Sequence, residues 1–335
     1  MTDDDMHTHA QEMRAIGHRL LRWRQGTYYW GDAIAYDALL DADEHVQAGW
    51  SEELARRLTR WSEHAVDSFD DALAPGYAAS RLLRAGLVDE SVVRRVVTAV
   101  TRLDRAEGVP LLRPQVPEWR NLVWVDSMYH VPSGLVAAGL ALEEQDLVSL
   151  GVDIARDTLA VLRVGDAVGH AWDAGLGRAT GVQWTRGIGW ALLGLLDVCE
   201  LAGEEAESVG LPGEARRLLD SLAGSQRENG QWPSVLGFPE ADDETSVAGF
   251  WLSAAYHPAG GATDAKVSER AVTALRSQAD PDGTVRGVSH DTHVRWDVQE
   301  YLHPATLPSP WGQGAALRGL AARFRAGVDM DQARP

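Results

Sequence analysis

A carboxylate among aromatic side chains is the feature of this sequence best suited to acid–base chemistry. Asp126 lies between Trp124 and Tyr129-His130, directly before an apolar run that predicts a buried helix. Apolar neighbours raise the pKa of a carboxyl group because they disfavour its charged form, and a general acid must hold its proton. Asp is also a favoured N-cap residue. The sequence therefore allows two roles for Asp126, catalysis and helix capping.

A second carboxylate lies before another apolar helix. Asp71 follows Asp70 and precedes Pro75-Gly76. If the starts of the two helices meet, Asp71 and Asp126 would form a carboxylate pair of the kind that glycoside hydrolysis uses. A solvated turn with a capping Asp explains the same residues equally well.

A third group centres on Arg186, which stands between Trp184 and Trp190 and is followed by Gly187. A guanidinium beside glycine suits recognition of a planar carboxylate, because its fork places two N–H groups against two oxygens. The alternative is an arginine stacked on tryptophan as part of the packing. His170 would hydrogen-bond either a substrate or a backbone carbonyl.

The elements that would position these residues are helices of two alternating kinds. About twelve helical segments form six pairs, and each pair joins a charged amphipathic helix to one that is apolar on most sides. The apolar segments are about 33–40, 76–83, 127–142, 184–200, 246–256 and 311–324. The charged segments are about 6–23, 50–68, 91–105, 146–162, 214–223 and 265–277.

This alternation predicts two concentric rings of helices. No long stretch shows the alternation of a strand, and no fixed-period repeat recurs. We therefore predict one all-α catalytic domain over residues 1–335, an (α/α)6 barrel with the apolar helices inside and with mobile ends at about 1–8 and 327–335. The loops before the inner helices would converge at one end of the barrel.

Five tryptophans lie at or near the starts of the apolar helices. They are Trp30, Trp124, Trp184, Trp251 and Trp311. Core packing explains any one of them, because an indole is large and apolar. Together they predict an aromatic-lined pocket, which is the usual form of a ligand site.

Composition restricts the partners. The net charge of −18 argues against a nucleic-acid partner, because phosphate binding depends on Lys and Arg. Cys199 is the only cysteine, so a disulfide within the chain is impossible. The acidic start lacks the pattern of a secretory signal, and no apolar stretch is long enough to span a membrane. We expect a cytoplasmic protein without a membrane partner, and a homodimer is compatible with the sequence.

Two metal hypotheses are weak. His290, His293 and His303 lack the ligand spacing that is diagnostic of zinc. The acidic run 67–71 would suit the magnesium–diphosphate site of a terpene synthase, but the candidate second motif at 242–246 has Phe250 where a further acid is needed. We expect neither a metal nor an organic cofactor.

The order and spacing of these motifs resemble the unsaturated glucuronyl and rhamnogalacturonyl hydrolases, glycoside hydrolase families 88 and 105, and the latter more closely. The resemblance covers about residues 28–325. The matching pieces are Phe69-Asp70-Asp71 before Pro75-Gly76, Trp124-Val125-Asp126, Gly169-His170 with Trp172, Trp184-Thr185-Arg186-Gly187 up to Trp190-Ala191-Leu192, Gly230-Gln231-Trp232 with Glu244-Thr245-Ser246, Asp282-Gly283-Thr284-Val285 with Gly287-Val288-Ser289, and Trp311-Gly312-Gln313-Gly314-Ala315.

The resemblance implies an (α/α)6 barrel and an unusual hydrolysis. Its substrate would be an oligosaccharide left by a polysaccharide lyase, whose terminal uronic acid carries a C4=C5 double bond. Protonation at C4 begins hydration of this vinyl ether, the resulting hemiketal opens, and no glycosyl-enzyme forms. Asp126 matches the general acid/base of the family and Asp71 its second essential carboxylate. The implied substrate-binding residues are Trp30, Trp124, His130, His170, Trp184, Arg186 and Trp190.

Departures from the family pattern bear on the substrate. His130 stands where the family usually has Met, the histidine that often precedes the Trp-x-Asp motif has no counterpart in 111–115, and the segment between His170 and Trp184 is short. These changes would reshape the sugar pocket around an unchanged acid. The alternatives are a sugar isomerase or epimerase on the same toroid, with His130, His170 or His293 as base, and a carbohydrate-binding toroid without activity.

Overall fold

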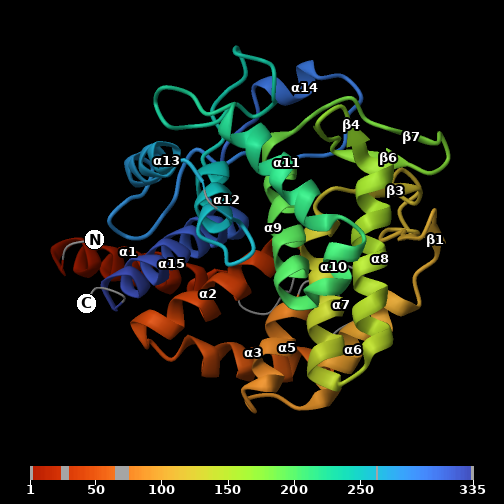
Figure 1. Ribbon diagram of the computed structural model, residues 1–335, viewed down its shortest axis with the longest axis horizontal. Coiled ribbons are helices and arrows are strands. Elements are labelled where there is room, and N and C mark those ends of the chain that lie inside the picture. Colours follow the sequence, from red (N-terminus) through yellow and green to blue (C-terminus); the bar gives the residue numbers. More distant parts are fainter. Residues whose placement is uncertain (1–2, 24–29, 65–74, 262, 333–335) are drawn as a thin grey trace.

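Six apolar helices form a closed ring in the computed structural model, which describes residues 3–23, 30–64, 75–261 and 263–332 (Figure 1). These inner helices are α2 (Ala33–Val46), α5 (Gly76–Arg84), α7 (Ser127–Leu142), α9 (Thr185–Ala202), α12 (Ser246–Ala255) and α15 (Pro310–Gln332). Each packs against the next in this order, and α15 returns to α2. Most of the residues of α7 and α9 are buried, as expected for helices that neighbours surround.

The amphipathic helices pack on the outside of this ring. They are α1 (Asp3–Arg22), α3 (Trp50–His64), α6 (Glu90–Thr101), α8 (Gln145–Leu162), α11 (Leu211–Ala223) and α13 (Ala265–Ser277). The apolar stripe of α3, with Trp50, Leu54, Leu58 and Trp61, is buried while its charged face meets water. The predicted (α/α)6 barrel and its alternation of helix types are confirmed.

Short elements that the sequence did not predict complete the chain. They are η1 (Trp30–Asp32), α10 (Glu204–Ser208), α14 (Gln299–Leu302), β1 (Arg105–Ala106), β2 (Val109–Pro110), β3 (Leu122–Trp124), β4 (Arg163–Val164), β5 (Ala167–Val168), β6 (Ala171–Asp173) and β7 (Arg178–Ala179). Strands of two or three residues are too short to show a period in sequence. Helices α1 and α15 also run further toward the two ends of the chain than expected.

Small residues bring the inner helices close together. A Cβ on Gly194 of α9 would lie 1.9 Å from the carbonyl oxygen of Met128 in α7, so only glycine fits at this contact. A Cβ on Gly249 of α12 would lie 2.4 Å from the carbonyl carbon of Ala315 in α15. Close contacts of the same kind occur at Gly189–Phe250 and Gly314–Ala35. The ring therefore closes with little space along its axis.

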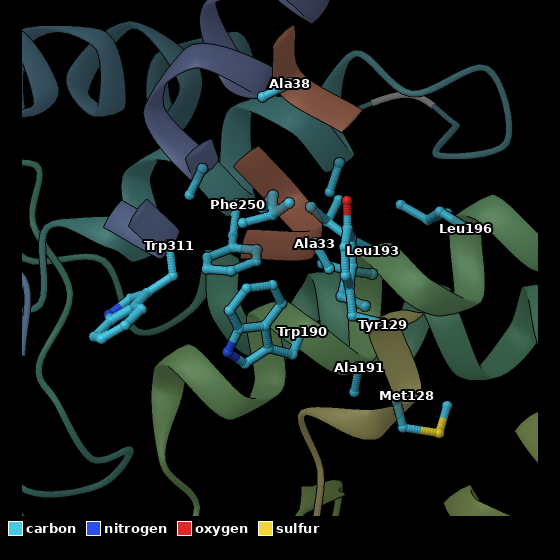
Figure 2. Packing of buried hydrophobic residues seen from close by; sticks show 14 of the residues in the cluster. Ala33, Ala38, Met128, Tyr129, Trp190, Ala191, Leu193, Leu196, Phe250 and Trp311 are labelled. Atoms are coloured by element: carbon cyan, nitrogen blue, oxygen red, sulfur yellow. The ribbon is translucent and has the colours of Figure 1, made fainter. Parts of the chain in front are cut away.

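Aromatic side chains fill the middle of the ring, as Figure 2 shows. Trp190 of α9 packs between Tyr129 of α7 and Phe250 of α12, with ring centroids 5.1 and 4.7 Å away. All three residues are at most 1% exposed. In the described part of the chain, no helix is both long and apolar enough to cross a membrane.

A buried ion pair closes the axis toward the C-terminal ends of the inner helices. Arg318 of α15 donates to both carboxylate oxygens of Asp197 on α9, at 2.6 and 3.1 Å, and to the Tyr129 hydroxyl at 2.8 Å. The Tyr129 hydroxyl in turn donates to Asp37 of α2 at 2.6 Å. Burial alone would raise the pKa of Asp197, but the charges of Arg318 and His257 bring it below the ordinary value. Four inner helices are thus joined by one polar network.

Loss of the Arg318 charge should weaken the whole barrel. We expect Arg318→Met to lower the free energy of unfolding by about 3–5 kcal/mol, because the buried Asp197 carboxylate would lose both hydrogen bonds from Arg318. Urea denaturation measures the difference. Arg94→Met is the control, since Arg94 pairs with Glu90 and Glu144 on the exposed surface and its loss should matter little. Equal effects of the two variants would contradict this role of the network.

Candidate functional site

A pocket of about 250 Å³ opens at the end of the barrel where the inner helices begin. Its walls come from the segments before α2, α7 and α15 and from the connection before β3. The lining residues are Trp30, Leu112, Arg113, Trp119, Trp124, Asp126, Ser127, His130, Asp291, Thr292 and His293. Indole faces and a few polar groups make this an environment for a sugar ring rather than for a purely apolar ligand.

The pairing of two short strands places Asp126 at the floor of this pocket. Trp124 in β3 pairs with Ala171 in β6, and the backbone N–H of Val125 donates to the carbonyl oxygen of His170 at 2.9 Å. Asp126 then occupies the residue before α7, but its side chain makes no capping hydrogen bond to that helix. The capping interpretation of Asp126 is therefore wrong, and its carboxyl group faces the pocket.

Burial governs the charge of Asp126. The residue is 8% exposed, and among the described residues none forms a hydrogen bond with its Oδ2. Desolvation raises the pKa of Asp126 from 3.8 to about 6, against the opposing charges of Arg186 and Arg113, while the Asp291 carboxylate adds to the rise. A carboxyl group with this pKa holds its proton in mildly acidic solution. Such a group can act as a general acid.

His170 forms the wall behind Asp126. Its Nε2 lies 3.8 Å from Asp126 Oδ2, and its Nδ1 lies 2.8 Å from the Tyr301 hydroxyl. Burial lowers the pKa of His170 to about 3, so the ring is neutral and the contact with Asp126 is not an ion pair. The rings of Trp184 and Trp124 enclose it, at 4.5 and 5.6 Å between centroids. His170 therefore adds no positive charge that would lower the pKa of Asp126.

Arg186 holds the loop on the opposite wall. Its guanidinium is fully buried, with the guanidinium carbon 4.5 Å from the Trp184 ring and 5.6 Å from the Trp311 ring. It donates to the carbonyl oxygens of Ser289 and His290 at 2.5 and 3.0 Å. This arrangement corresponds to the packing alternative that the sequence left open, and it does not place Arg186 along the pocket.

Glu244, a residue to which the sequence analysis gave no role, reinforces this loop. Its carboxylate lies 3.6 Å from the Arg186 guanidinium and accepts hydrogen bonds from the backbone N–H and the hydroxyl of Ser289. Both charged groups are fully buried. The pair fixes residues 289–292, which carry Asp291 and Thr292 into the pocket.

The remaining predicted site residues divide into two sets. Trp30 and His130 line the pocket beside Trp124. Trp190 lies in the core beneath Trp30, 6.1 Å between ring centroids. Burial lowers the pKa of His130 to about 4, so this ring is also neutral. Asp71 lies outside the described residues.

One of the five tryptophans does not belong to this end of the barrel. Trp251 stacks on Trp232 at 6.0 Å between ring centroids, and its indole N–H donates to the Ser268 hydroxyl at 3.2 Å. It is the sixth residue of α12, about one and a half turns beyond the helix start. The expectation that Trp251 would contribute to the pocket is therefore wrong.

The structure brings to the pocket three residues without a role predicted from sequence, Arg113, Trp119 and Asp291, together with His293, which the sequence offered only as a weak metal ligand or as the base of an isomerase. Arg113 and Trp119 lie in the connection before β3, and Asp291 and His293 lie between α13 and α14. In the sequence, residues 290–293 stood out only because they are rich in His and Asp, which suggested a metal site. Among the described residues, no group of three or more His, Cys, Asp or Glu is arranged to hold a metal ion.

Comparisons with known proteins agree with this architecture. The family model described as Glycosyl Hydrolase Family 88 matches residues 1–326 of the chain. A solved structure described as a possible member of the GH105 family, from Salmonella enterica serovar Paratyphi A, has a TM-score of 0.85 at 15% identity and covers 98% of this chain and 95% of its own. No curated protein sequence matches the chain.

Two further solved structures share the fold. The glycoside hydrolase of family 105 from C. acetobutylicum has a TM-score of 0.77 at 14% identity, covering 95% of this chain and 99% of its own. The unsaturated glucuronyl hydrolase from Bacillus sp. GL1, described as responsible for the degradation of glycosaminoglycan, has a TM-score of 0.73 at 18% identity, covering 96% and 97%.

The buried carboxyl group should reduce the stability of the fold at neutral pH. The pKa of Asp126 is raised from 3.8 to about 6 in the folded protein, so folding favours the protonated carboxyl group. The free energy of unfolding therefore falls as the pH rises from 3.8 through 6. Asp126→Asn should therefore raise the free energy of unfolding at pH 7.5 by up to about 3 kcal/mol, with the gain vanishing below about pH 4. Denaturant titrations at both pH values test this, with the exposed Asp166→Asn as control. A gain independent of pH would contradict the assignment of the shift to Asp126.

Proposed function

Since the chain belongs to glycosyl hydrolase family 88, we propose that it removes a 4,5-unsaturated uronic acid from the non-reducing end of oligosaccharides that polysaccharide lyases leave. The observation that carries this proposal is the buried Asp126 carboxyl group, which faces an aromatic pocket and has its pKa raised to about 6. Protonation of a carbon–carbon double bond needs a proton donor that is shielded from water. The unsaturated glucuronyl hydrolase among the solved structures has the same fold.

The reaction that we propose adds water across the C4=C5 bond. Asp126 gives its proton to C4, and the positive charge that develops at C5 is shared with the ring oxygen. Water attacks C5 and returns a proton to the Asp126 carboxylate, so the acid is restored. The hemiketal then opens, and the rest of the oligosaccharide leaves as an alcohol. One water is consumed, and no bond forms between the sugar and the enzyme.

The surroundings of Asp126 suit both halves of this cycle. The neutral rings of His170 and His130 leave the proton on Asp126, and the Asp291 carboxylate favours the protonated form. The indoles of Trp30 and Trp124 offer faces on which a sugar ring can stack. We propose Asp71 as the second essential carboxylate, on the resemblance of its motif alone. Small imported oligosaccharides as substrates agree with the predicted cytoplasmic location.

The test of the reaction is the decay of the ultraviolet absorbance of the conjugated C4=C5 uronate. We expect wild-type protein to bleach at least one member of a panel of lyase-generated disaccharides from rhamnogalacturonan and glycosaminoglycans. Asp126→Asn should slow this decay by about 10²–10⁴-fold, the usual contribution of a general acid. Asp166→Asn is the matched control. Turnover that survives in Asp126→Asn would refute the role of Asp126, and no decay on any substrate would refute the proposed reaction.

The pH dependence of the rate should report the same group. A general acid acts while protonated, so kcat/KM is expected to hold at low pH and to fall as the pH rises through about 6. Asp291→Asn removes a negative charge that supports the protonated form. In that variant the fall should move to lower pH. If kcat/KM falls at the same pH in Asp291→Asn as in wild-type protein, Asp291 does not raise the pKa of Asp126.

A further inference from the structure

We propose that Arg113 binds the carboxylate of the unsaturated uronic acid, whereas Arg186 only positions the opposite wall. This inference rests on the proposed function and adds to it the residue that selects an acidic sugar. The sequence suggested carboxylate recognition for Arg186 and no role for Arg113.

The reaction fixes the place of that carboxylate. Asp126 must reach C4, and the carboxylate is attached to the neighbouring atom C5. The acidic group therefore lies within a few ångströms of the Asp126 carboxyl group. A carboxylate placed there without a counter-charge would be costly, since it would leave water and lie near the Asp291 carboxylate.

Arg113 is the only Arg or Lys side chain that lines the pocket in the described part of the chain. Arg186 is fully buried, and its two terminal nitrogens donate to Ser289, His290 and Thr292. Turning it toward a ligand would leave two buried carbonyl groups without these bonds, which is costly. The charge of Arg186 is felt at Asp126 more strongly than that of Arg113, but of the two guanidinium groups only that of Arg113 lines the pocket and can contact bound substrate.

Arg113 is also held in a suitable orientation. Its guanidinium carbon lies 4.8 Å from the Trp119 ring centroid and 4.7 Å from that of Trp124. Stacking uses the faces of a guanidinium, whereas a carboxylate binds at its edge, so the two interactions are compatible. Trp124 belongs to β3, which also delivers Asp126. The acid and the cation are thus positioned by the same strand.

Electrostatics agrees with this placement. The charge of Arg113 lowers the pKa of both Asp126 and His130, which shows that it is felt on two sides of the pocket. His293 stacks on Trp119 at 5.6 Å between ring centroids and is exposed at the opening. The pocket therefore has its partly exposed cation against the rings of Trp124 and Trp119, with His293 further out at the opening, where a next sugar could stack.

The experiment compares two substrates that differ in one charge: an unsaturated uronyl disaccharide and its uronate methyl ester. At pH 5, below the pKa of Asp126, wild-type protein should prefer the free acid by about 10–100-fold in kcat/KM, the size of one hydrogen-bonded charge pair. Arg113→Met should lose this preference through a higher KM for the acid, with the ester little affected. Arg113→Lys should keep part of it. The control is Arg178→Met, because Arg178 stacks on Trp296 outside the pocket.

Three outcomes overturn the inference. A preference for the acid that persists in Arg113→Met would show that another group binds the carboxylate. A shift of the pH profile with unchanged KM would show that Arg113 only tunes Asp126. If wild-type protein hydrolyses neither substrate, the proposed function fails, and calorimetry with glucuronate and its methyl ester then decides the role of Arg113. Binding of glucuronate that Arg113→Met leaves intact would overturn it.

Discussion

The closed ring of inner helices is the constraint on which the rest of the structure depends. Helices that are apolar on most sides must be surrounded, and glycines at their contacts let them approach closely enough to do so. Once the ring closes, the axis is filled by Trp190, Phe250 and Tyr129. Polar chemistry is then confined to the two ends of the barrel, where loops and helix termini meet.

The two ends of the barrel differ in how they pair buried charge. Arg318 pairs directly with Asp197 and lowers its pKa, whereas Asp37 in the same network accepts a hydrogen bond from the Tyr129 hydroxyl and has its pKa raised to about 7 by burial. Around Asp126, burial is not offset by a direct ion pair, and the pKa rises. The first arrangement joins the helices, whereas the second keeps a proton available at the cost of stability. The proposed reaction depends on leaving the Asp126 carboxyl group incompletely compensated.

The pair of arginines shows how position overrides residue type. Both Arg113 and Arg186 stack on tryptophan, and both would suit carboxylate recognition. Arg186 stands at the start of an inner helix, where Glu244 and the 289–292 loop cover it. Arg113 belongs to an irregular connection with no helical period, yet it lines the pocket. The arginine in the more conspicuous motif is buried in the wall, and the one in the less conspicuous segment lines the pocket.

The sequence by itself determined the helices, their inner or outer place and the position of Asp126 before an inner helix, because periodicity, burial preference and local motifs are properties of short segments. Tertiary structure decided which distant residues surround that carboxyl group. The β3–β6 pairing brings His170 beside it, and the buried Arg186–Glu244 pair brings Asp291 across the pocket. These contacts join segments far apart in the chain, so they depend on closure of the barrel rather than on any local pattern.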